Sequence, residues 1–243
     1  MCVLVLSASF YSNDILRSYY LLKLGKGDFQ TRRAILQKLR ALNCVDIEEH
    51  LVRLMTRNAD VDSRLFSANS LKEASPLSPH IVYLIAELLK SGCDEDRLFS
   101  AFVLSGIGES AAPAINAIVE ATSDDTPLVR KYCCEAIANV KRPVSLFLQA
   151  LIARLREDKD EQVLKAALVS LSTFGADSSG AVVETVKLLE VGSYELKAQA
   201  SRLLGSIGPN AKGAVSCLKL LSKHEVDYVR ESAVDALRRI EAQ

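Results

Sequence analysis

The chain has 243 residues, of which 49% are hydrophobic, and its length alone allows one or two packed domains. Its 30 Lys and Arg residues balance 30 Asp and Glu residues, and this zero net charge argues against strong non-specific attraction to polyanions. Six cysteines show neither a C-x-x-C spacing nor a pairing pattern, which indicates a reducing compartment and hence a cytoplasmic protein.

The N-terminal segment Met1–Phe10 is apolar, but serines interrupt it and it lacks a positively charged start, which disfavours a signal peptide. No stretch of the chain approaches the roughly 20 apolar residues that span a bilayer, so we expect no membrane partner. The segment precedes a repetitive array, and terminal repeats need an atypical cap. We therefore expect residues 1–12 to cover the exposed end of the first repeat.

A repeat runs through the rest of the chain. The pentapeptide Arg-Leu-Phe-Ser-Ala occurs at Arg64–Ala68 and again at Arg97–Ala101. Similar steps along the chain reach the corresponding positions of the other copies, namely Arg32, Arg130, Leu164, Lys197 and Arg230. Self-similarity at such a period is typical of a solenoid, in which each unit buries its apolar face against its neighbours.

Each copy predicts a pair of helices. The second helix of the pair carries an apolar stripe at spacings of 0, 4, 7, 8 and 11 residues, counted from the residue before the basic position. In the fourth copy this stripe is Val129, Cys133, Ala136, Ile137 and Val140. The first helices are predicted at Ile47–Arg57, Pro79–Lys90, Ala112–Ala121, Pro143–Arg156, Ala181–Val191 and Ala211–Ser222. Glycines that follow periodic helices, at Gly108, Gly175 and Gly208, predict left-handed helix caps.

These features resemble the HEAT repeat, and the short repeats of phycobilisome-lyase-like HEAT proteins are the nearest form. The resemblance rests on the Val-Arg pair that opens the second helix, on Asp124 and Asp158 five residues before that Val, and on the Ile-Gly-Pro-x-Ala linker. It covers Asn13 to Ala242 and implies one all-α domain, a right-handed α-solenoid of about seven two-helix repeats over residues 1–243. Three residues depart from the pattern, namely Asn58 and His224 at the Asp position and Leu164 at the Arg position. They predict that the ladder of Asp–Arg pairs, one pair per repeat along the solenoid, is interrupted.

No constellation of catalytic residues accompanies the repeat. His50, His80 and His224 lack the partners that a metal site requires, so solvated or capping roles are expected. Cys133 takes a core position, which leaves only Cys134 accessible, and nothing nearby lowers its pKa. The repeated basic residues could follow a nucleic-acid backbone, but in HEAT-like repeats this position usually pairs with the carboxylate of the preceding turn. We therefore expect no cofactor and no metal, and catalysis is not the favoured reading.

In HEAT proteins the second helices line the concave face. Positions 2, 5, 6 and 9 of each stripe are expected to point into that groove, with position 3 at its edge. Large apolar side chains occupy such positions in successive repeats, and basic residues lie at the N-terminal end. The predicted partner-binding residues are Leu65, Phe66, Leu98, Phe99, Phe102, Tyr132, Leu168, Arg33, Arg40 and Lys72. For Phe66 and Phe99, lateral packing between repeats is an equal alternative.

The sequence thus predicts a non-catalytic scaffold or adaptor that binds a protein or peptide across repeats two to four. Leu98, Phe102 and Tyr132 are the expected anchors, and the basic end is expected to orient the partner. Two alternatives follow from the resemblance. One is a nucleic-acid-binding protein similar to the alkylated-base DNA glycosylases, and the other is a protein similar to the bilin lyases.

Overall fold

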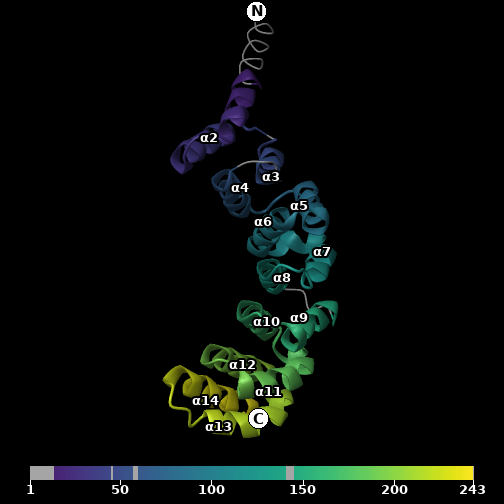
Figure 1. The fold of residues 1–243 in the computed structure, drawn as a ribbon, viewed down its shortest axis with the longest axis vertical. Coiled ribbons are helices and arrows are strands. Elements are labelled where there is room, and N and C mark those ends of the chain that lie inside the picture. The colour runs from purple at the N-terminus through teal and green to yellow at the C-terminus, as the bar shows by residue number, and fades with distance from the viewer. Residues whose placement is uncertain (1–13, 45, 57–59, 141–144, 243) are drawn as a thin grey trace, which may run out of the picture. The chain divides into compact units, whose positions relative to one another are not determined.

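A computed structural model of the protein describes residues 14–44, 46–56, 60–140 and 145–242. These residues form helices and connecting turns, with no strand among them (Figure 1). The contacts divide the chain into two compact units, one up to Val103 and one from Leu104 on. The predicted all-α fold is confirmed. The expected cap at Met1–Phe10, the departure at Asn58 and the predicted helix start at Pro143 lie outside the described residues.

The first unit opens with helical residues 14–24. The helices that follow are α2 (Phe29–Ala41), α3 (Ile47–Thr56), α4 (Val61–Glu73), α5 (Pro79–Ser91) and α6 (Asp94–Gly106), whose last residues belong to the second unit. Three of these helices begin at a side-chain cap, because the Asp28, Asp60 and Ser78 side chains accept a hydrogen bond from an otherwise unpaired main-chain N–H of the first turn.

The second unit continues the alternation of helices. Its α-helices are α7 (Ile115–Ala121), α8 (Pro127–Val140), α9 (Ser145–Glu157), α10 (Glu161–Thr173), α11 (Val182–Val191), α12 (Tyr194–Ile207), α13 (Val215–Leu221) and α14 (Asp227–Glu241). The second helices α8, α10, α12 and α14 pack side by side in chain order, and the first helices α7, α9, α11 and α13 form the other layer (Figure 1). This arrangement confirms the helix-pair repeat within the unit.

Three linkers fold as 3-10 helices, at η1 (Gly108–Ala114), η2 (Gly175–Ala181) and η3 (Gly208–Ala214). Their first glycines have positive φ angles of 60°, 54° and 70°, as predicted for glycines that end helices, but the ψ angle of −140° takes Gly208 outside the left-handed helical region. The predicted starts of the following α-helices at Ala112 and Ala211 are too early, because the linker tightens into a 3-10 turn before the α-helix begins.

The predicted stripe forms the core. In the fourth copy Val129, Cys133, Ala136, Ile137 and Val140 are all at most 2% exposed. The small side chains in this stripe let neighbouring helix axes approach closely without leaving voids. Two predicted core positions, Phe174 and Leu237, are only half-buried.

Candidate interaction surface

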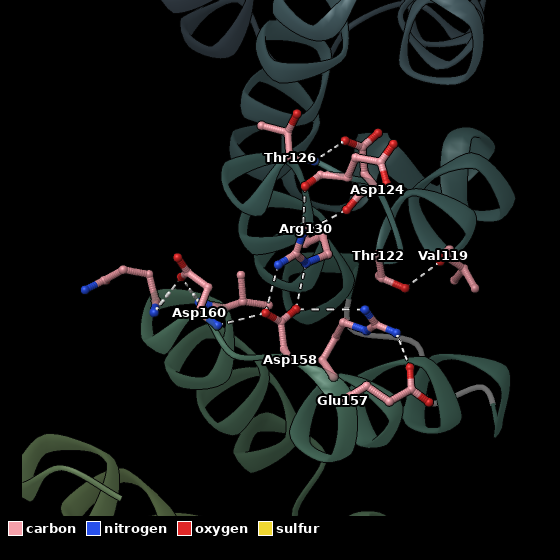
Figure 2. A network of polar contacts seen from close by, with 12 residues as sticks. Val119, Thr122, Asp124, Thr126, Arg130, Glu157, Asp158 and Asp160 are labelled. Carbon is pink, nitrogen blue, oxygen red and sulfur yellow. Dashed lines mark hydrogen bonds and ion pairs between the residues drawn. The ribbon is translucent and has the colours of Figure 1, made fainter.

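The repeated arginine is built into the stack of helices. Arg130 on α8 donates from Nε and Nη2 to both carboxylate oxygens of Asp158, over 2.6 and 2.8 Å, and from Nη1 to the main-chain oxygens of Asp124 and Asp125 (Figure 2). The Asp158 side chain is 1% exposed. This bidentate pair therefore fixes α8 against the turn between α9 and α10 and serves the fold.

The direction of this pairing differs from the expectation. The preceding turn gives Arg130 its carbonyl oxygens, whereas the carboxylate comes from the following repeat. Arg64 repeats the pattern, because its Nη2 lies 2.6 Å from Asp96 and its Nε donates to the oxygen of Met55. A turn at the end of a helix presents unpaired carbonyls, so an arginine that follows it is satisfied there by main chain.

The pairing changes the pKa values of both partners. Burial alone would raise the pKa of Asp158, but the hydrogen bond from Arg130, the main-chain N–H of Asp160 and the neighbouring positive charges lower it below its ordinary value. The same pair raises the pKa of Arg130. Both groups are therefore charged at neutral pH.

Substitutions modify the ladder in the predicted copies. Leu164 is buried in the arginine position, and the next residue, Lys165, contacts Glu195 of the following repeat at 2.6 Å. His224 accepts a hydrogen bond through Nδ1 from the N–H of Val226, as Asp124 does from Thr126. A solvated or capping role is predicted for His224, and this hydrogen bond lies in the turn before α14, whose N-cap residue is Val226.

The predicted surface residues fall into three groups. Arg33, Arg40 and Leu65 are exposed. The half-buried group consists of Lys72, Leu98, Phe99, Phe102 and Tyr132. Leu168 is 0% exposed, so the prediction that it lines an open surface is wrong. Phe66 is only 4% exposed, although it borders two hollows between α2 and α4.

The error has a systematic cause. Position 5 of the stripe is buried in six copies, at Leu36, Ala68, Ala101, Cys134, Leu168 and Ser201. The second helices pack against one another within their own layer as well as against the first helices, which widens the buried arc of each helix. Phe66, at position 3, packs edge-on against Phe29 with ring centroids 5.5 Å apart. Lateral packing, the alternative weighed for Phe66, is what the structure shows.

Cations lie over the aromatic residues of this layer. In the first unit, Lys72 Nζ lies 3.9 Å from the ring centroid of Phe102, and the Arg64 guanidinium lies 5.7 Å from that of Phe99. Lys131 Nζ lies 4.5 Å from the Tyr132 ring in the second unit. Such contacts keep long side chains extended over aromatic faces at the surface. The contacts of Lys72 and Arg64 could not be predicted from one stripe because they join different copies, whereas Lys131 and Tyr132 are neighbours on α8.

A second feature of the first unit lies between α2 and α4. Two hollows open there, of about 120 and 290 Å³, and both are lined by Phe29, Phe66 and Asn69. Arg33 and Arg40 line the smaller hollow, and Arg32 and Leu65 line the larger one. We call the two together the α2–α4 groove. Phe29, which is 54% exposed, was not among the predicted residues. The sequence feature that could have identified Phe29 is its place as a large aromatic residue just before the stripe of the first copy.

The side chains that could act as nucleophiles or metal ligands are either buried or far from one another. Cys133 and Cys134 are both 0% exposed, so the expectation that Cys134 is accessible is wrong. Burial raises the pKa of Cys133 well above its ordinary value and that of Cys134 to about 12, which keeps both as thiols. In the described part of the chain, no cluster of His, Cys, Asp or Glu is arranged to hold a metal ion, and no helix there is long and apolar enough to cross a membrane.

Comparison with known proteins places this architecture in a class. Residues 81–172 match the family model for HEAT repeats. No curated protein sequence matches the chain. An engineered protein of the Northeast Structural Genomics Consortium superposes with a TM-score of 0.66 at 21% identity, over 82% of this chain and 99% of its own. A designed armadillo repeat protein gives 0.57 at 18%, over 92% and 99%.

A mutant of Kap121p gives a TM-score of 0.68 at 13% identity, over 93% of this chain and 29% of its own. At these identities the likeness shows the fold alone. The chain therefore contains a segment, residues 81–172, that is similar to HEAT repeats, and it has the fold of an all-α repeat solenoid.

Proposed function

We propose that the protein is a non-catalytic scaffold or adaptor that binds a partner protein through the α4–α6 face, defined by Leu65, Lys72, Leu98, Phe99 and Phe102. The stacked pair of Lys72 and Phe102 is the observation that carries the proposal. Leu98 and Phe102 are half-buried at positions 2 and 6 of the third copy, which lie outside the predicted core stripe of positions 0, 4, 7, 8 and 11. Aromatic side chains framed by cations are characteristic anchors of protein interfaces.

The second unit carries a related arrangement at Lys131 and Tyr132, and we assign the same role to it. Reducing conditions in the cytoplasm fit a chain whose described cysteines are all free. Nucleic acid is the weaker alternative, because Arg64 and Arg130, which would have to contact phosphates, are already saturated by carboxylates and carbonyl oxygens.

The test uses Phe102→Ala, with Val169→Ala as a matched control. Val169 holds the same position of the stripe in the fifth copy and is 46% exposed. Partners captured from a lysate of the native host are compared between wild type and variants. We expect Phe102→Ala to keep its melting temperature and to lose a captured partner, at a cost of about 2 kcal/mol of binding free energy. Val169→Ala should change neither.

Two results would contradict the proposal. If the melting temperature of Phe102→Ala falls sharply while the remaining folded protein binds as before, Phe102 serves the core. If the purified protein binds DNA duplexes or single strands with an affinity that drops steeply with salt, nucleic acid takes the place of the protein partner.

A further inference from the structure

The α2–α4 groove contains an arginine with unused donors. Arg32 is 5% exposed and lines the larger hollow. It has one side-chain hydrogen bond to the described residues, from Nη2 to Asp60 at 3.4 Å, and its Nε has no partner among them. Asp60 is itself engaged, because its carboxylate accepts from the hydroxyl and the N–H of Ser63. A buried cation with so few partners retains most of its desolvation cost.

The other copies show what this position normally achieves. Arg130 donates to two carboxylate oxygens and two carbonyl oxygens, and Arg64 donates to Asp96 and two carbonyl oxygens. The arginine in this repeat position therefore has acceptors for its donors in the second and fourth copies, at Arg64 and Arg130. In the first copy, where the groove opens, Arg32 is nearly unpaired. An incoming carboxylate would supply the missing acceptor.

Apolar side chains surround the same space. Phe29 and Phe66 form an edge-on pair that lines both hollows, and Leu65, which is 46% exposed, lines the larger one. Arg33 and Arg40 line the smaller hollow, are exposed, and form no ion pair with any described residue. A ligand that fits must combine an apolar group with negative charge.

The carboxylates of the groove decide between two classes of partner. Asp28, Asp62 and Glu73 also line the hollows, and none of them pairs with Arg32, Arg33 or Arg40. A continuous phosphate backbone would be repelled by these three groups. A peptide can instead place a single carboxylate at Arg32 and an apolar side chain against Phe29.

We propose that the α2–α4 groove binds a segment of a partner protein in which an Asp or Glu side chain lies next to a large apolar side chain. The carboxylate pairs with Arg32 in the larger hollow, and the apolar side chain packs on Phe29 and Leu65. Arg33 and Arg40 add positive charge from the adjoining smaller hollow. The proposal rests on the proposed protein-binding function and names the chemistry of the bound segment.

The probe is a short peptide with a single Glu next to a Leu-Phe pair and no other charged residue, acetylated and amidated so that its one carboxylate belongs to a side chain. Calorimetric titration compares it with a twin in which Gln replaces Glu, and with a twin in which Ala replaces Leu and Phe. We expect each twin to bind roughly tenfold more weakly or worse, as for the loss of a charge-assisted hydrogen bond or an apolar anchor.

The protein variants have repeat-matched controls. Arg40→Gln and Phe29→Ala should each weaken binding of the acidic peptide by roughly tenfold. The controls are Arg238→Gln and Tyr194→Ala, which change the equivalent positions of the seventh and sixth copies and should leave the affinity unchanged. Arg32→Lys removes Nε and should also weaken binding, and the melting temperature of this variant is measured to check that it folds. If it does not fold, the Phe29→Ala variant decides the test, because Phe29 is exposed.

The proposal is overturned if the peptide does not bind at low salt, or if the twin without acids binds equally well. It is also overturned if oligothymidine binds more tightly and loses affinity in Arg40→Gln, because the groove would then serve nucleic acid. If the peptide test fails in one of these ways while partner capture still depends on Phe102, only the groove assignment is refuted. The proposal for the α4–α6 face would then stand.

Discussion

At the scale of single residues, Arg130 and Asp158 form a bidentate ion pair. The Asp158 side chain is 1% exposed and that of Arg130 is 14% exposed. Asp158→Asn removes the negative charge and leaves the guanidinium without its counterion, so we expect the free energy of unfolding to fall by about 3 kcal/mol. Urea denaturation measures the change.

The seventh copy supplies the control for this prediction. Arg230 holds the same repeat position and pairs with Asp227, whose side chain is 78% exposed. Solvent screens this pair, and Asp227→Asn should therefore cost about 1 kcal/mol or less. Equal losses in the two variants would show that burial of the ion pair does not set its contribution.

His50 gives the first unit a dependence on pH. Burial lowers the pKa of His50 more than its hydrogen bond with the main chain of Leu21 raises it, and the charge of Arg53 lowers it further. The unfolded chain thus binds the proton more readily, so stability is complete above the ordinary pKa of 6.5 and declines as pH falls through the folded value.

We expect His50→Gln to remove this part of the decline between neutral and mildly acidic pH, as measured by thermal melts across that range. His80→Gln, which changes an exposed histidine of the same unit, is the control. A slope that persists unchanged in His50→Gln would assign the titration to another group.

At the scale of helices, the contact between α12 and α14 depends on a glycine. A Cβ at position 205 would lie 3.0 Å from the Cα of Ala236 and 3.3 Å from its Cβ. Alanine favours a helix by about 1 kcal/mol over glycine, but overpacking of a helix contact costs about 1–3 kcal/mol. Gly205→Ala should therefore lower the melting temperature.

Gly213→Ala is the matched control, because a Cβ there would meet no atom within 4 Å. We expect its melting temperature to stay the same or to rise slightly, since alanine restricts the unfolded chain. If Gly205→Ala behaves in the same way, the close approach of α12 and α14 does not constrain this position.

Helix periodicity explains how much of the fold could be predicted. A stripe such as Val129, Cys133 and Ile137 identifies a buried face from a single helix, and glycines such as Gly208 mark where helices end. Periodicity does not reveal how closely neighbouring helices approach one another within a layer. For this reason the prediction that Leu168 is exposed is wrong.

The candidate site was less predictable for the same reason. The exposure of Arg33 and Arg40 follows from their distance from the stripe. The unused donors of Arg32 and the hollow beside Phe29 arise only when α2 and α4 are packed together, and no single stripe encodes them. Contacts between copies were thus the part that sequence reasoning could not supply.

At the scale of the whole molecule, each repeat of a solenoid is stabilised by its neighbours. Damage at one contact should accordingly loosen nearby helices more than distant ones. In Asp158→Asn we expect faster amide hydrogen exchange in α8, α9 and α10 and unchanged exchange in α3 and α5. Mass spectrometry after proteolysis resolves these segments, and a uniform increase along the chain would show global cooperativity instead.

The origin of the carboxylate that pairs with Arg130 has a consequence for how such chains are duplicated or recombined. The covalent repeat ends with α8, yet Asp158 lies beyond α9, so a breakpoint placed between repeats separates the two charges. A block that begins at α8 and ends after the turn that follows α9 keeps both. A grafted module that runs from α8 to the turn after α9 should keep its ion pair complete. In a module that ends directly after α8, the arginine needs a new counterion from the host protein.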